Sequence, residues 1–355
     1  MMRGWKKTVR ARLRRLEDTV WLLSRPKLIV EWYRMWQTLP VTPWLRAADA
    51  FINKDFKLAV EYYQRGLAKK PNHPARHCAV MDLAYCRYRT GGLEEANELL
   101  SSLTSQSVAL RDAYLLQAKI SDFFGKAESA LQIVSDGLML FPDDLKLMLA
   151  YLHTSLFNGL YHARLGEIRE HILTLKRTLL LDDDRQVLID SALAHYELRC
   201  GDGEGAERMI ARVLATGRAP HEIVLLRGER LLAQRRVLQA REQLGRVMRM
   251  APRNPRPVRL LAESYLLPEE FHEPDYAEQL ATLACKMTNW KNVECVDLLS
   301  RVYDEKGDTS TAELLGERCR GLKLAVELER EQVEAPTGHV SEAAESRMRS
   351  NKLSM

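Results

Sequence analysis

Long apolar runs are absent from this sequence: no stretch approaches the roughly 18 residues that a helix needs to cross a bilayer. The start of the chain is basic, but no uninterrupted apolar segment or small-residue cleavage site follows, so we expect no secretory signal. The six cysteines include no C-x-x-C pair. We expect them to be reduced thiols that pack as small apolar side chains, which predicts a cytoplasmic location.

Sequence motifs for catalysis are also missing. The chain contains no phosphate-binding glycine loop, no H-E-x-x-H and no G-x-S-x-G, the patterns that carry nucleotide, zinc and serine-nucleophile chemistry. His73 and His77 are one helical turn apart, but the sequence fixes no third ligand, so a capping or surface role is favoured over a metal site. The sequence therefore predicts a protein that is not an enzyme and needs no cofactor.

Proline is scarce, with 13 residues in 355, which suits a chain made mostly of helices. Small residues recur instead at a spacing close to 34. One shared position is held by Ala59, Ala96, Ala130, Ala206, Ala240, Ala277 and Ala312. Twelve residues earlier stand Ala47, Ala84, Ala118, Ala194 and Gly228, and five residues earlier stand Gly91, Gly125, Gly201 and Gly307. Proline closes three units at Pro71, Pro142 and Pro252.

This pattern resembles the tetratricopeptide repeat family, in which small residues mark the crossing of two helices, a glycine the turn and a proline the end of each unit. The resemblance covers about 40–330 and implies an all-α fold, a right-handed superhelical solenoid of about eight helix-turn-helix units. The units are expected at 40–73, 77–110, 111–144, 145–184, 187–220, 221–254, 255–292 and 293–331. The fourth is degenerate, with Arg164 in place of the small residue, and the seventh carries a three-residue insertion. A last amphipathic stretch, near 320–331, is expected to cover the open end.

Residues 1–39 differ from the repeats because they hold ten Lys/Arg against three acids, a net charge of +7. Apolar residues recur there at helical spacing, which predicts an amphipathic helical extension. It either caps the first unit, since a solenoid end must be covered, or docks on an anionic membrane or partner; nucleic acid is the least favoured partner. The docking residues would be Trp5, Lys6, Lys7, Arg10, Arg14, Arg15, Trp21, Trp32 and Trp36. The polar tail, 332–355, is expected to be flexible.

A second basic region, 208–259, contains thirteen Arg, no Lys and three acids, for a net charge of +10. Most of these arginines fall on the second helix of their units, which in the family faces the convex side. The patch is Arg208, Arg212, Arg236, Arg241, Arg246 and Arg249. It is either a solvated face of an Arg-biased chain or a site for acidic partners. Aromatic residues are not interleaved with it, which argues against single-stranded nucleic acid.

The family resemblance also places a partner-binding groove on the first helices of the units. The predicted groove residues are Trp44, Phe51, Met81, Tyr85, Tyr88, Leu115, Lys119, Phe123 and His153. Their aromatic and apolar character suits an apolar or amphipathic peptide. Some of them could instead be core residues. The carboxylate clamp of chaperone-binding members is not expected, because its basic and amide positions read Trp44, Ala48, Asp82, Asp112 and Leu116 here.

The sequence thus favours a non-catalytic interaction scaffold or adaptor that binds a protein or peptide, with a peripheral role at a membrane as an extension of that interpretation. Two alternatives stay open. One is a nucleic-acid-associated factor that uses the basic N-terminus and the 208–259 arginines. The other is a structural assembler in which residues 1–39 of one molecule enter the groove of the next, that is, self-association.

Overall fold

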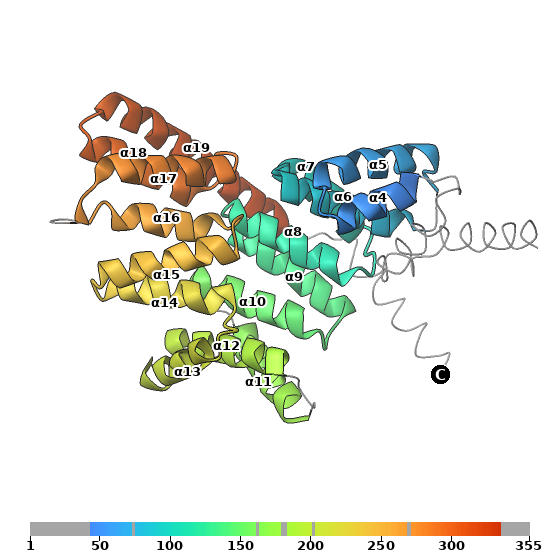
Figure 1. Cartoon of the computed structure of the whole chain (residues 1–355), viewed down its shortest axis with the longest axis horizontal. Helices are drawn as coiled ribbons and strands as arrows, with labels where there is room; N and C mark the ends of the chain where they lie inside the picture. The colour runs from blue at the N-terminus through green and yellow to red at the C-terminus, as the bar shows by residue number, and fades with distance from the viewer. Residues whose placement is uncertain are drawn as a thin grey trace, which may run out of the picture.

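The computed structural model describes residues 43–72, 75–160, 163–178, 183–200, 203–267 and 271–334. These residues form sixteen α-helices that follow one another as antiparallel pairs, labelled α4 to α19 (Figure 1). The residues predicted to dock on a membrane or partner, Trp5 to Trp36, lie outside the described residues, as do His73, Gly201 and the predicted tail from 335 onward.

The described helices form eight consecutive antiparallel pairs, which confirms the all-α repeat fold. The first four pairs are α4 (Pro43–Ile52) with α5 (Phe56–Lys69), α6 (Arg76–Thr90) with α7 (Leu93–Thr104), α8 (Arg111–Phe123) with α9 (Ala127–Leu140), and α10 (Leu145–Phe157) with α11 (Ala163–Thr178). The last four are α12 (Asp183–Cys200) with α13 (Gly203–Ala215), α14 (His221–Ala233) with α15 (Val237–Met250), α16 (Pro255–Ser264) with α17 (Pro274–Met287), and α18 (Val293–Glu305) with α19 (Thr309–Glu334).

The small residues allow the two helices of a pair to approach closely. Ala59, Ala96, Ala130, Ala206, Ala240 and Ala277 are all 0% exposed, as expected where helix axes cross. At Gly228 even a single added methyl group would come within 2.9 Å of Leu244 Cδ2. The 34-residue spacing is therefore the sequence signature of these crossings.

The turn between the two helices of a pair needs a left-handed residue. Gly91, Gly125 and Gly307 have φ of 99°, 79° and 78°, a region that glycine enters without steric cost. The equivalent positions of the first and sixth units are held by Lys54 and Arg235, with φ of 61° and 60°. The turn geometry is thus kept even where the glycine signal is absent from the sequence.

First helices of successive units contact one another along one side of the stack: α6 with α8, α8 with α10, α10 with α12, α12 with α14, α14 with α16 and α16 with α18. This row forms the inner face. In the degenerate fourth unit, Arg164 is partly buried and its guanidinium lies 5.6 Å from the ring centre of Tyr151. A charged side chain at the crossing position thus stacks on an aromatic ring instead of entering the helix interface.

The amphipathic stretch expected near 320–331 lies within the second half of α19, which runs without a break from Thr309 to Glu334. Its outer half presents Leu324 and Leu328 to solvent, with 57% and 50% of each residue exposed. The buried anchors of α19 are Ala312, Leu315 and Cys319 in its first turns. No helix in the described part of the chain is long and apolar enough to cross a membrane.

Candidate functional site

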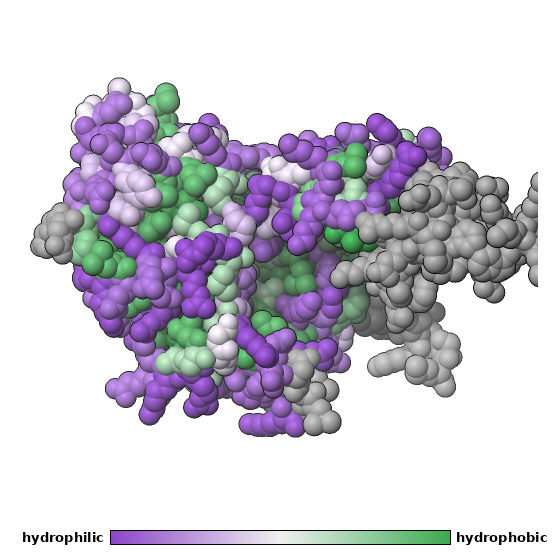
Figure 2. Space-filling view, in the orientation of Figure 1, coloured by the Kyte–Doolittle hydropathy of each residue, from purple (hydrophilic) through white to green (hydrophobic). Residues whose placement is uncertain are grey.

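Two adjoining hollows open on the inner face of the stack. The first, which we call the α6–α8 hollow, measures about 390 Å³ and is lined by Phe51, Met81, Asp82, Tyr85, Asp112, Leu115, Leu116 and Lys119. The second, the α8–α14 hollow, measures about 380 Å³ and includes Leu115, Lys119, Phe123, Leu149, His153, Phe157, Glu222 and Arg256. Both are lined in part by Leu115 and Lys119, so they form one continuous path. A recess with apolar atoms on its floor is visible between the two arms of the stack (Figure 2).

A row of aromatic rings follows this path. Phe51 lies 5.6 Å from Tyr85, Tyr85 lies 6.2 Å from Tyr88, and Tyr88 lies 6.4 Å from Phe123, measured between ring centres. The ammonium group of Lys119 sits 5.9 and 5.7 Å from the ring centres of Tyr88 and Phe123, within the range of a cation–π contact. The wall between the two hollows therefore combines apolar rings with one cation.

Seven of the nine predicted groove residues line the hollows: Phe51, Met81, Tyr85, Leu115, Lys119, Phe123 and His153. The other two lie elsewhere. Trp44 packs against Gly66 of α5, where its ring is 3.2 Å from the position of an added Cβ. Tyr88 is only 7% exposed and belongs to the core beneath the wall. Both fall on the helix faces that meet a neighbouring helix, which a repeat register alone does not resolve.

Charged groups from three helices meet in the α8–α14 hollow. Asp122 accepts a hydrogen bond of 2.9 Å from Asn158 Nδ2, and burial raises its pKa. His221 Nδ1 lies 3.1 Å from the carboxylate of Glu222. Burial alone would raise the pKa of Glu222, but the adjacent His221 and His153 lower it below the usual value. The carboxylates of Asp122 and Glu222 therefore each have a partner within the protein, Asn158 and His221 respectively.

A histidine pair forms part of the wall behind this hollow. His153 Nδ1 and His195 Nδ1 lie 3.1 Å apart, so one ring donates to the other. His195 is 0% exposed, and its Nε2 has no hydrogen-bond partner among the described residues. Because burial disfavours the charged imidazolium, it lowers the pKa of His153 and moves that of His195 well below its usual range. Both rings are therefore neutral near pH 7.

A seam that sequence reasoning did not anticipate joins the ends of α6, α8 and α10 to the starts of α16 and α18. The main-chain oxygens of Arg89, Phe123 and Phe157 stand 34 residues apart at the ends of α6, α8 and α10. Each accepts a hydrogen bond from a side chain near the start of α16 or α18. The donors are Arg253 Nη2 at 2.6 Å, Asn292 Nδ2 at 3.0 Å and Arg256 Nη2 at 2.6 Å, respectively. Carbonyls at helix ends lack an intrahelical partner, so the seam satisfies three equivalent ones.

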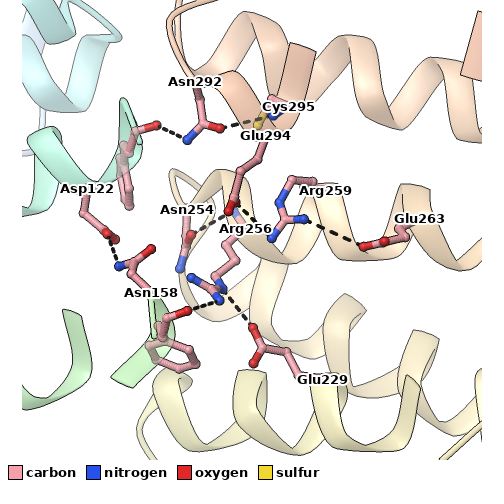
Figure 3. A network of polar contacts seen from close by, with 12 residues as sticks. Asp122, Asn158, Glu229, Asn254, Arg256, Arg259, Glu263, Asn292, Glu294 and Cys295 are labelled. Atoms are coloured by element: carbon pink, nitrogen blue, oxygen red, sulfur yellow. Dashed lines mark hydrogen bonds and ion pairs between the residues drawn. The ribbon is translucent and has the colours of Figure 1, made fainter. Parts of the chain in front are cut away.

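Ion pairs among α14, α16 and α18 hold the donor side of the seam (Figure 3). Arg256 Nε lies 2.8 Å from Glu229 Oε1, and the two side chains are only 20% and 13% exposed. Arg259 lies 3.1 Å from Glu294 and 3.7 Å from Glu263. The C-terminal arm also reaches the second unit, where Lys291 Nζ lies 3.1 Å from Glu94. The seam therefore fixes the curvature of the stack, and with it the width of the hollows.

The arginines of the predicted basic patch differ in exposure, and Arg241 forms hydrogen bonds within the protein. Arg208, Arg212, Arg236 and Arg249 are exposed and Arg246 is partly buried. Arg241 instead donates to Ser264 Oγ, to the Ser264 oxygen and to the Phe271 oxygen at 3.1, 3.0 and 2.9 Å. Its guanidinium also lies 3.5 Å from the ring centre of Tyr265. Arg241 is thus a brace for the insertion of the seventh unit and differs from the rest of the patch.

Neighbouring acids lower the net positive charge of the same region. Arg227 and Arg230 both pair with Glu207, and Arg218 lies 3.3 Å from Asp184.

Among the described residues, no group of three His, Cys, Asp or Glu side chains could hold a metal ion. His77 is exposed on α6.

Comparison with known proteins supports the fold. A tetratricopeptide repeat protein from Parabacteroides merdae superposes with a TM-score of 0.50 at 16% identity, over 72% of this chain and 95% of that one. Human IFIT1, solved as a dimer with m7Gppp-AAAA, gives a TM-score of 0.47 at 15% identity, over 78% of this chain and 66% of that one. Neither a family model nor a curated relative matches the sequence. The chain therefore has the helix-pair repeat fold seen in the Parabacteroides merdae tetratricopeptide repeat protein.

Proposed function

We propose that this protein is a non-catalytic scaffold or adaptor that holds a peptide or short helix of a partner protein in the two hollows of its inner face. The supporting observation is the continuous path from Phe51 to Phe157, which is apolar and aromatic along most of its walls. Concave, largely apolar sites with a few polar groups are typical binding sites. Fold alone does not establish a function, so the proposal rests on the site.

The shape of the hollows favours a partner segment over a whole folded domain. Each hollow is about 380 to 390 Å³, which accommodates a few side chains. Leu115 and Lys119 lie at their junction, on successive turns of α8. A peptide that places apolar side chains at intervals along its length could fill both at once, because anchoring side chains in pockets carry most of the binding free energy.

Residues 1–39 extend the proposal to a membrane-peripheral assembly of several proteins, of the kind found at cell envelopes. Their net charge of +7 and four tryptophans suit an anionic lipid surface. Co-sedimentation of the full chain with anionic and with neutral liposomes tests this part. We expect pelleting with anionic lipid only; equal behaviour with both would contradict it.

Peptide selection tests the inner-face site. A random peptide library displayed on phage is selected on the full chain, and the recovered peptides are measured by fluorescence anisotropy. We expect Leu115→Ser to weaken binding about tenfold or more, because it removes apolar surface shared by both hollows. Leu238→Ser is the matched control, since Leu238 is 68% exposed on the second helix α15. Equal affinities for both variants would overturn the proposal.

A further inference from the structure

Asp82, in the wall of the α6–α8 hollow, has no basic partner among the residues that the structure describes. It lies on α6 beside Met81, and it shares the hollow with Phe51 and Tyr85. One carboxylate oxygen, Oδ2, accepts a hydrogen bond of 2.9 Å from the hydroxyl of Tyr63. Tyr63 itself is 1% exposed, so this contact anchors the carboxyl group from behind.

Other charged groups around this hollow are committed elsewhere. Asp112 Oδ1 lies 2.8 Å from Arg111 Nη2, and 62% of the Asp112 side chain is exposed at the rim. The ammonium group of Lys119 is directed to the rings of Tyr88 and Phe123. Within the described parts of the chain, no Lys, Arg or His nitrogen comes within 4.0 Å of the Asp82 carboxylate. A carboxylate held in apolar surroundings without a cation is energetically costly.

We propose that Asp82 receives the cationic side chain, lysine or arginine, of an apolar segment of a partner protein bound in the α6–α8 hollow. This inference rests on the proposed function and specifies what the partner must supply. A cation placed there would pair with a carboxylate for which the described residues supply no counter-charge. The ring of Phe51, 5.6 Å from that of Tyr85, offers a π face to the same cation, whereas Tyr85 already has the guanidinium of Arg89 5.8 Å from its ring centre. Apolar side chains next to it would fill the space between Met81 and Leu115.

The charge pattern along the path assigns a direction to the partner. The α6–α8 hollow carries Asp82 and the rim residue Asp112, and Lys119 stands at its junction with the second hollow. Lys146 lines the second hollow, whose acids Asp122 and Glu222 contact Asn158 and His221. Neither lysine is paired with a carboxylate in the part of the chain that the structure describes. A segment with its basic residue toward α6 and any acidic residue toward α10 would match both ends.

Peptides selected on the full chain provide the first test. We expect lysine or arginine to be enriched next to apolar residues in peptides from the wild-type chain, and not in those selected on Asp82→Asn. The amide keeps the size of the carboxyl group, and its oxygen can still accept from Tyr63. For a peptide bound by the wild type, Asp82→Asn should weaken binding about tenfold or more, and replacing its basic residue by norleucine should weaken it similarly.

A double-mutant cycle then isolates the pair. Once the peptide carries norleucine, Asp82→Asn should change the affinity less than twofold, because the interaction has already been removed. Asp112→Asn is the matched control, since Asp112 already pairs with Arg111 and its loss should change the affinity less than twofold. Enrichment of acidic or uncharged peptides, or equal losses for the two variants, would overturn the inference.

The pH dependence of binding gives an independent readout. Burial raises the pKa of Asp82 to about 7, although the hydrogen bond from Tyr63 acts in the opposite direction. The groups that face it are Tyr63 on α5, Cys78 and Cys86 on α6, and Asp112 and Lys119 across the hollow. The ionised form binds the cation, so affinity should fall as pH decreases from 8 to 6. Asp82→Asn should remove this dependence, and its persistence would contradict the inference.

The two proposals fail in different ways. If no selected peptide depends on Leu115, the inner-face function itself is wrong. If peptides depend on Leu115 but not on Asp82, only the cation site is wrong. A synthetic peptide of residues 1–39, which carries ten Lys/Arg, is measured alongside. Asp82-dependent binding of that peptide in preference to the selected ones would replace the external partner by a second copy of this chain.

Discussion

The side-chain amide of Asn292 donates a hydrogen bond of 3.0 Å to the main-chain oxygen of Phe123, a residue 169 positions earlier. The same side chain caps α18, because Asn292 Oδ1 accepts from Cys295 N at 3.1 Å. One buried asparagine thus satisfies the end of one helix and the start of another. Its neighbourhood is tight, since Asn292 Nδ2 would lie 3.2 Å from a Cβ added at Gly125.

Asn292→Asp separates these two roles. An aspartate can still cap α18, but it offers no donor to the Phe123 oxygen and places a negative charge against it. We expect a loss of about 1–3 kcal/mol in the free energy of unfolding, measured by urea denaturation. Asn254→Asp is the control, since Asn254 Oδ1 caps α16 by accepting from Arg256 N at 3.0 Å and the exchange keeps that acceptor. Equal destabilisation by both variants would show that the seam adds nothing.

Arg241 should protect the insertion between α16 and α17. Arg241→Lys removes the planar guanidinium that reaches Ser264 and Phe271 together. The loss of hydrogen bonds to a charged group favours local opening. We expect chymotrypsin to cleave at Tyr265 or Phe271 about tenfold faster in this variant. Arg246→Lys, at a partly buried position on the same helix, should leave the cleavage rate unchanged.

Gly228→Ala should destabilise the sixth unit although alanine favours helices. The new methyl group would lie 2.9 Å from Leu244 Cδ2, and Leu244 is 0% exposed. Overpacking of this kind costs about 1–3 kcal/mol. Gly245→Ala on α15 meets only Arg249 Nη1 at 3.9 Å and should gain up to about 1 kcal/mol. Thermal unfolding midpoints that shift in the same direction would refute the crossing role of Gly228.

The His153–His195 pair predicts a loss of stability in mild acid. Burial lowers the pKa of both rings in the folded chain, and that of His195 falls well below its usual range. The folded rings therefore bind protons less readily than the unfolded rings, which bind them below about pH 6.5. The unfolded state then binds more protons, so the free energy of unfolding falls as pH decreases, by up to about 1.4 kcal/mol per pH unit for each ring. The fall should begin near pH 6.5.

Urea titrations between pH 7 and pH 5 measure this slope. His195→Phe should flatten it, whatever the absolute stability of that variant, since His195 no longer titrates. His171→Gln serves as the control, because His171 is 40% exposed and lies 3.0 Å from Asp143 on the surface. A slope unchanged by His195→Phe would mean that other groups cause the acid sensitivity.

Several features of the binding face could be predicted from the sequence. The repeat register placed Phe51, Met81, Tyr85 and Leu115 on first helices, and all four line the α6–α8 hollow. The register failed for Trp44, because its side chain packs against Gly66 of α5 and does not face the hollow. In the sequence, Asp82 stood out only as an acid at a position where the carboxylate clamp has a basic or amide side chain. Its lack of a cation depends on which side chains surround it in space.

The sequence by itself determined the local architecture of this protein. Residues twelve or fewer positions apart decide where helices cross and turn, so the small residues and Gly91, Gly125 and Gly307 predicted eight helix pairs. Only the tertiary structure decided that the ends of α6, α8 and α10 meet the starts of α16 and α18. That contact joins residues such as Arg89 and Arg253, 164 positions apart, and depends on the accumulated rotation between successive units. No short-range sequence pattern predicts this accumulated rotation, and the rotation sets the curvature of the inner face and the size of its hollows.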